Sequence, residues 1–108
     1  MEVGVSGSGN IEFSVDADNL EVKVSGSGDI ELAGTAHAAE IRISGSGDID
    51  ASQLRVRSCE AKVTGSGDIS INVSDELDAG VVGSGDIYYK GDPRVRSRIT
   101  GSGDVRSN

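Results

Sequence analysis

One column of carboxylates is the part of this sequence best suited to chemistry. The motif S-G-S-G-D-I, or a close variant of it, recurs through the chain, and each copy carries Asp, or once Asn, directly after its second glycine. These residues are Asn10, Asp29, Asp48, Asp68, Asp86 and Asp104. Calcium prefers carboxylate and carbonyl oxygens, and stacked Asp residues in glycine-rich β-solenoid turns can hold it. The five aspartates are therefore candidate calcium ligands.

The same column has a simpler structural interpretation, which we favour. Calcium-binding nonapeptide repeats follow the pattern G-G-x-G-x-D, whereas Asp here directly follows Gly and returns only every 18 to 20 residues. Asp and Asn side chains also accept backbone N–H groups at bends, a role that Asn10 can serve as well as Asp. We predict that the column stabilises turns, and calcium binding is the alternative.

The sequence offers few residues for catalysis. His37 is the single histidine and lies in the variable half of a repeat, where we expect an exposed loop. Cys59 is the single cysteine and falls at an apolar position, so we expect a buried side chain without a disulfide partner. No triad or zinc set can be built from these two residues. We predict no catalytic residues, no cofactor and no enzyme; a carbohydrate-active enzyme that uses paired carboxylates is a weaker alternative.

A short repeat must position these side chains. The tripeptide G-S-G begins at Gly7, Gly26, Gly45, Gly65, Gly83 and Gly101. A period of 18 to 20 residues is too short for paired helices, and β-branched residues fill the intervals. We predict an all-β fold, a single-domain parallel β-helix (β-solenoid) over residues 1–108, with about 5.5 coils. Each coil should contain two or three short strands and wind right-handed.

Apolar residues alternate with polar ones through every copy of the motif. With the first Gly of each G-S-G numbered zero, the even positions from −6 to +6 are apolar or Gly with few exceptions, and we expect them to face inward, both glycines and Phe13 included. Position −2 holds Val5, Val24, Ile43, Val63, Val81 and Ile99, and position +4 holds Ile11, Ile30, Ile49, Ile69, Ile87 and Val105. This alternation predicts a thin core that runs the length of the solenoid.

The odd positions should form columns on the outer wall. Position −5 holds Glu2, Glu21, Glu40, Glu60, Asp78 and Arg96, and position −3 holds Gly4, Lys23, Arg42, Lys62, Gly80 and Arg98. Hydroxyl residues dominate position −1 and fill position +1. The neighbouring charged columns have largely opposite signs, which offsets repulsion within each column. We interpret them as an ordinary solvated wall, because exposed ion pairs are common and weak.

Charge and hydropathy exclude two classes of partner. The net charge of −8 falls on the first half, since residues 1–53 hold ten acidic and two basic side chains and residues 54–108 hold eight of each. This balance argues against nucleic-acid binding, which requires a basic stripe. No apolar run is long enough to span a membrane, and no signal-peptide pattern precedes the repeats.

The repeated motif resembles a known bacterial family. The segment Ile41-Arg42-Ile43-Ser44-Gly45-Ser46-Gly47-Asp48-Ile49 is similar to the repeats of the head GIN domain of putative auto-transporter adhesins. The resemblance implies an exported β-helix in the periplasm, on the outer membrane surface or secreted. It also implies that this chain is the C-terminal part of a longer domain. It implies no known activity, so we expect an adhesin-like or structural module that meets glycan or protein at the cell surface.

Both ends of such a solenoid expose strand edges. The first coil begins at Glu2-Val3-Gly4-Val5 without a capping segment, and the last coil ends at Arg106-Ser107-Asn108. Uncovered edges favour pairing with further strands. We therefore predict either end-to-end self-association or a missing N-terminal cap.

Overall fold

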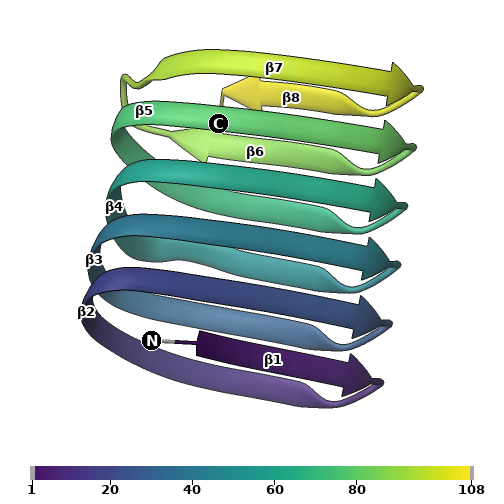
Figure 1. Cartoon of the computed structure of the whole chain (residues 1–108), viewed down its shortest axis with the longest axis horizontal. Helices are drawn as coiled ribbons and strands as arrows, with labels where there is room; N and C mark the ends of the chain where they lie inside the picture. Colours follow the sequence, from purple (N-terminus) through teal and green to yellow (C-terminus); the bar gives the residue numbers. More distant parts are fainter. Residues whose placement is uncertain (1, 108) are drawn as a thin grey trace.

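Each sequence repeat makes one turn of a parallel β-helix (Figure 1). The computed structural model describes residues 2–107, all of whose regular structure is β-strand. The strands are β1 (Glu2–Gly7), β2 (Asn10–Gly26), β3 (Asp29–Gly45), β4 (Asp48–Gly65), β5 (Asp68–Gly83), β6 (Asp86–Lys90), β7 (Arg94–Gly101) and β8 (Asp104–Ser107). They pair in the order β1-β2-β3-β4-β5-β6-β8, and β7 pairs with β5. The predicted all-β parallel β-helix is confirmed; Met1 and Asn108, the outer bounds of the predicted domain, lie outside the described residues.

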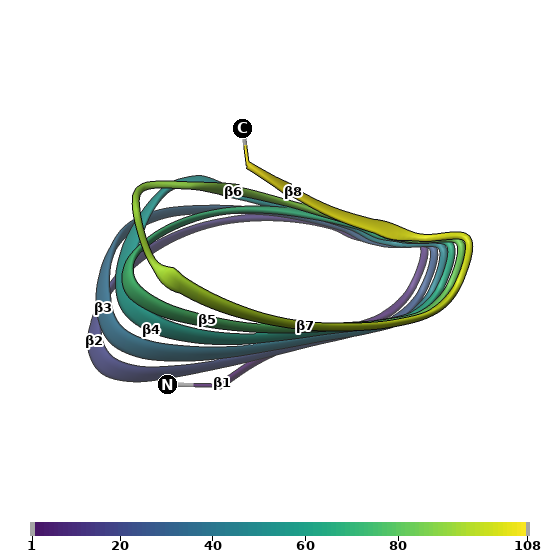
Figure 2. The ribbon, with the colours of Figure 1, turned by 90° about the horizontal axis from the view of Figure 1, so that it is seen from above.

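The coil winds right-handed. Seen along its axis with the C-terminal coil toward the viewer, the chain runs counter-clockwise as it rises from β1 to β8 (Figures 1 and 2). This is the hand that parallel strand connections almost always adopt, because strands themselves twist right-handed.

The G-S-G turns stack in register and hold the coils together. The first glycine of each copy pairs with the first glycine of the next, from Gly7 to Gly101. At each turn the Ser N–H of one coil donates to the glycine carbonyl of the coil below, as from Ser27 to Gly7 and from Ser46 to Gly26, at 3.0–3.1 Å. The coils accordingly superimpose at this turn and spread apart at the opposite bend, where the sequence varies (Figure 2).

The strands are longer than the sequence predicts. β2 to β5 contain 16 to 18 residues each and continue through the bend opposite the G-S-G turn. The prediction of two or three short strands per coil is therefore wrong for these coils, and His37 lies on β3 rather than in a loop. A curved strand keeps its ladder hydrogen bonds around the bend, which a loop would lose. Between residues 2 and 107, the strands are interrupted only by the two residues at each G-S-G turn and by residues 91–93. Pro93, which has no N–H to donate, lies in that second kind of gap, between β6 and β7.

The two glycines of each turn have different roles. The second glycine is inward, as predicted: Gly47 is buried, and a Cβ there would meet the Gly28 carbonyl oxygen at 2.5 Å and Val24 Cγ1 at 2.6 Å. The first glycine is not inward. Gly45 is exposed, and its φ of +114° lies in a region that side-chain-bearing residues rarely adopt. Its place in the motif is therefore explained by this backbone conformation and by the coil below, because a Cβ on Gly45 would lie 2.6 Å from the Gly26 carbonyl oxygen.

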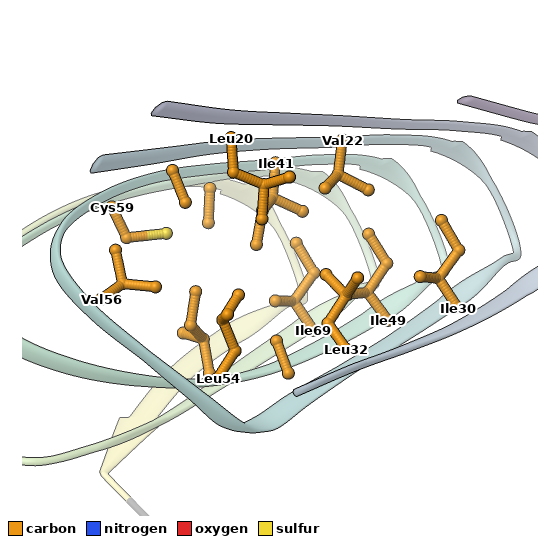
Figure 3. Close-up of a cluster of buried hydrophobic side chains, with 14 of the residues drawn as sticks. Leu20, Val22, Ile30, Leu32, Ile41, Ile49, Leu54, Val56, Cys59 and Ile69 are labelled. Atoms are coloured by element: carbon orange, nitrogen blue, oxygen red, sulfur yellow. The ribbon is translucent and has the colours of Figure 1, made fainter. Parts of the chain in front are cut away.

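The core consists of stacked aliphatic side chains. Positions −2 and +4 are buried through the central coils, with Val63, Ile69 and Ile87 fully enclosed. Figure 3 shows the two walls facing each other, with Leu20, Val22 and Ile41 on one side and Ile30, Ile49 and Ile69 on the other. The variable half adds buried residues that the motif-based alignment does not include: Val15, Ala36, Leu54, Val56 and Val73.

The end coils leave some predicted core residues exposed. Phe13 in the first coil is 38% exposed, and Val95 and Ile99 in the last coil are 37% and 41% exposed. The alternation assigned all three to the inner face, and the prediction that Phe13 is buried is wrong. Each terminal coil has a neighbouring coil on one side only, which leaves these three side chains partly exposed, although Val3 and Val5 of the first coil are buried.

Candidate functional site

One outer wall carries paired columns of opposite charge, as the odd positions predict. Glu21 pairs in register with Glu40, and Lys23 pairs with Arg42. Within the second and third coils the neighbours form ion pairs, with Lys23 Nζ 3.2 Å from Glu21 Oε1 and Arg42 Nη2 2.6 Å from Glu40 Oε1. The lysine and arginine side chains are half exposed, so these pairs contribute little to stability and remain available to solvent.

An open groove lies between the cationic column and the adjacent hydroxyl column. We call it the hydroxyl–cation groove; its polar and glycine lining is Gly4, Ser6, Lys23, Ser25, Arg42, Ser44, Lys62 and Thr64. The second, third and fourth coils each supply one hydroxyl and one cation, at the spacing of about 4.8 Å that separates neighbouring strands, whereas the first coil has Gly4 in place of the cation. Charge-assisted hydrogen bonds from Lys and Arg, together with Ser and Thr hydroxyls, suit a ligand with repeated anionic and hydroxyl groups.

The Asp column forms hydrogen bonds between coils. The backbone N–H groups of Asp68, Asp86 and Asp104 each donate to the Oδ1 of the aspartate one coil below, at 3.2 Å. In the lower coils the N–H groups of Asp29 and Asp48 donate instead to the carbonyls of Gly9 and Gly28. The carboxylates therefore accept backbone donors, as the turn interpretation expects, but the donor belongs to the next coil and not to the same bend.

The column's like charges affect the most enclosed aspartate. Burial raises the pKa of Asp68; the hydrogen bond from the Asp86 backbone opposes this shift, and the charges of Asp48 and Asp86 add to it. In the part of the chain that the structure describes, no group of three or more His, Cys, Asp or Glu is placed to hold a metal ion.

A second acidic column, which the sequence reasoning did not include, lies beside the first. Glu12, Glu31 and Asp50 occupy position +5 of the lower three coils and line an open groove with Asn10, Asp29 and Asp48. A hydrogen bond with Glu12 and the negative charge of Glu12 raise the pKa of Glu31. Higher up the same column the residues change to Ser70, Tyr88 and Arg106. Extending the period-2 alignment to position +5 would have shown this change of charge.

Cys59 is buried and His37 is exposed, so these two side chains do not form a site together. Cys59 is buried with its sulfur pointing into the interior beside Val56 (Figure 3), as predicted. Burial, with a smaller contribution from the Glu60 charge, raises the pKa of the Cys59 thiol to about 12. His37 is exposed on the outer wall.

Cys59 is expected to resist alkylation in the native protein. Thiolate is the reactive form, and both the high pKa and the burial suppress it, so iodoacetamide at neutral pH should modify the folded chain at less than about 1% of the rate for the urea-unfolded chain. Mass spectrometry of timed samples measures both rates. Equal rates in the two states would contradict the buried position.

The family model of the putative auto-transporter adhesin, head GIN domain, matches residues 1–93. The chain belongs to this family. Membership supports an adhesin-like role for this head GIN domain and indicates a location at the cell surface or in the envelope.

Three solved structures show the same fold. A putative adhesin from Parabacteroides merdae is 38% identical with a TM-score of 0.91, and the match covers 97% of this chain and 45% of that one. A putative lipid binding protein from Parabacteroides distasonis is 35% identical with a TM-score of 0.88, over 100% of this chain and 53% of that one. A putative adhesin from Bacteroides fragilis is 33% identical with a TM-score of 0.87, and the match covers 97% of this chain and 53% of that one.

This head GIN domain spans about half the length of the structures it matches. None of the three is described as an enzyme. The comparison with curated proteins finds no match. Among residues 2–107, no helix is long and apolar enough to cross a membrane.

Proposed function

We propose that this head GIN domain is a non-enzymatic adhesive module of the bacterial envelope that binds an anionic glycan along its outer wall. The observation that carries the proposal is the hydroxyl–cation groove, in which Lys23, Arg42 and Lys62 follow one another in register beside a hydroxyl column. A polymer that lies across the coils would meet the same pair of groups at each step. We place the domain outside the cytoplasm, as part of a longer envelope protein.

Rigidity supports this assignment. The groove lies on continuous strands whose inner faces are buried, so its side chains are spaced by the ladder itself. A preorganised wall loses little conformational entropy on binding, and several weak contacts at fixed spacing add in strength. The acidic column beside the groove partly neutralises the cations and should restrict binding to ligands that present anions at the groove itself.

The binding test compares two variants of equal charge change. The groove variant carries Lys23→Ser, Arg42→Ser and Lys62→Ser; the control carries Arg55→Ser, Arg57→Ser and Lys90→Ser, which change exposed cations outside the groove. The probes are heparin and polygalacturonate, with uncharged dextran for comparison, in titration calorimetry. The groove variant should lose at least about tenfold in affinity, because each lost ionic hydrogen bond costs about 1.5–3 kcal/mol when it is made fully.

Two results would contradict the proposal. Equal loss in both variants would indicate nonspecific charge attraction, and no binding by the unmodified chain would remove the anionic-glycan ligand. The polysaccharides should be recovered at their original length. Chain shortening that stops when a single carboxylate is changed would instead indicate a carbohydrate-active enzyme.

Calcium binding by Asp29, Asp48, Asp68, Asp86 and Asp104 is the second candidate. The stacking of like charges around Asp68 favours a cation there, whereas the hydrogen bonds already accepted by Asp48, Asp68 and Asp86 reduce their capacity for one. Thermal melts in calcium and in EDTA test it directly. Equal melting temperatures would leave the aspartates with a structural role alone.

The variant Asp68→Asn separates the structural role of the Asp column from calcium binding. Asn keeps an Oδ1 acceptor for the Asp86 N–H and removes a charge flanked by Asp48 and Asp86, so stability at pH 7 should rise by about 0.2–0.5 kcal/mol after solvent screening. Because the folded-state pKa of Asp68 is raised, its charge disfavours the folded state above that pKa. The gain should therefore shrink as pH falls through the raised pKa toward the ordinary value of 3.8. Urea titrations across this range measure it; a loss of stability only in calcium would favour metal binding.

A further inference from the structure

The first coil contains a glycine, Gly9, that the atoms around it do not require. In the second coil, a Cβ at Gly28 would meet the Gly9 carbonyl oxygen at 2.7 Å and Val5 Cγ1 at 2.5 Å, because this position packs on the coil below. The same position in the first coil is Gly9, where an added Cβ has no atom within 4 Å. Gly9 is exposed, and its φ lies outside the left-handed region. Packing would demand glycine here only if another coil lay beneath it.

The opposite end of the solenoid presents the surface that such a coil would have. Ile99 and Val95 on β7 are 41% and 37% exposed, although both occupy inward positions. The backbone edges of β7 and β8 lie at the top of the coil and those of β1 at the bottom (Figure 1). Unpaired edges with apolar residues beside them favour the addition of further strands.

Charge reverses between the two ends in two separate columns. At position −5 the column begins with Glu2 and ends with Arg96, and at position +5 it begins with Glu12 and ends with Arg106. The last coil carries four arginines, Arg94, Arg96, Arg98 and Arg106, against the single acid Asp104. The first coil, residues 2–15, carries Glu2 and Glu12 without a basic residue.

We propose that a second copy of this chain stacks head to tail on the first, so that β1 of one copy pairs with β7 of the other in the register used between coils. The repeat alignment then places Arg96 against Glu2 and Arg106 against Glu12. Ile99 would cover Val5, and Gly101 would lie beneath Gly7. The Ser8 N–H would donate to the Gly101 carbonyl, as Ser102 donates to Gly83 within the chain.

The charge pattern favours a second copy over other occupants of these ends. A capping segment from elsewhere in a longer protein would explain the space beneath Gly9, but it would not explain why the far end reverses both acidic columns. If the two ends of the chain are complementary to each other, stacking of copies explains both the open space beneath Gly9 and the reversal of charge at the far end. Such a contact does not close on itself, so the expected assemblies are linear chains of copies.

Gly9→Ala is the first test, because it should leave the single copy intact. Its Cβ has free space in the isolated chain but would collide with the Gly103 carbonyl and the Ile99 side chain of a copy stacked below. Sedimentation velocity over a range of concentrations should show concentration-dependent growth for the unmodified chain and at least about tenfold weaker association for Gly9→Ala. Thermal melting at low concentration should be unchanged. A chain that stays monomeric throughout, or equal association by both proteins, would overturn the proposal.

A charge exchange identifies the surfaces. The variant Arg96→Glu with Arg106→Glu and the variant Glu2→Arg with Glu12→Arg should each associate weakly alone, since like charges then face each other. In a mixture, the acidic top of the first variant should bind the basic bottom of the second, and the basic top of the second should bind the acidic bottom of the first. Alternating linear assemblies of the two variants should therefore form. Assembly of the mixture, with neither variant self-associating alone, would support stacking of copies; an inert mixture, or undiminished self-association of either variant, would contradict it. Neither readout depends on the proposed glycan, because both measure mass and not ligand binding.

Discussion

Gly47→Ala is expected to destabilise the protein by about 3 kcal/mol, the upper part of the range for overpacking a close-packed interior. The added methyl would lie 2.5 Å from the Gly28 carbonyl oxygen and 2.6 Å from Val24 Cγ1. Neither can retreat without disturbing the ladder, because Gly28 lies in a turn that is bonded to the coils around it. The backbone at Gly47 does not need a positive φ, so the loss would measure steric crowding alone.

The measurement is thermal and urea denaturation of Gly47→Ala beside Gly9→Ala. Both variants make the same substitution at the same position of the motif, in the third coil and in the first. The melting temperature of Gly47→Ala should fall by about 12 °C or more for a chain of this size, while that of Gly9→Ala should not change at low concentration. If both variants lost the same stability, the cost would come from glycine's local conformation and not from stacking.

Ile69→Ala is expected to destabilise the protein by about 3 kcal/mol or more, the usual cost of a cavity left by a large aliphatic residue. Ile69 is fully buried and stacks in register between Ile49 and Ile87. Ladder bonds on both sides hold its coil at a fixed spacing, so the neighbouring coils cannot move in to fill the space. The lost contacts therefore cannot be replaced.

Val82→Ala is the matched control for Ile69→Ala. Val82 is 47% exposed at an outward position of the same strand, β5, so truncating it should change stability by less than about 0.5 kcal/mol. Thermal and urea denaturation of both variants measure the difference. Similar losses at the two positions would contradict the inward and outward assignment on which the whole fold rests.

Each coil contacts chiefly the coils directly above and below it. Stability in such an architecture is close to a sum over coil interfaces, and the two end coils each lack one. The exposed Phe13, Val95 and Ile99 show where that contribution is missing. Head-to-tail stacking would supply one further interface for each copy added.

Much of this fold could be predicted from the sequence because the repeat is short and regular. The recurrence of G-S-G every 18 to 20 residues gave the length of each coil, and the period-2 alternation identified the core faces at positions such as Val63 and Ile87. Alternation works because successive side chains on a strand point to opposite faces. The alignment did not extend into the variable half, where the pairing register shifts after Glu31 and Ala51 and where Leu54 and Val56 are buried outside the aligned positions.

The repeat in the sequence is enough to show which residues share a column, and so to predict the charged wall, the hydroxyl column and the Asp column. What each member of a column contacts could be seen only in the folded chain. Gly9 and Gly47 occupy the same motif position, yet one faces open space and the other a carbonyl oxygen. Asp48 and Asp104 are also equivalent, but only Asp48 has a further coil above it to donate an N–H to its carboxylate. A repeat specifies a residue's direction from the wall, whereas its contacts depend on whether another coil lies above or below.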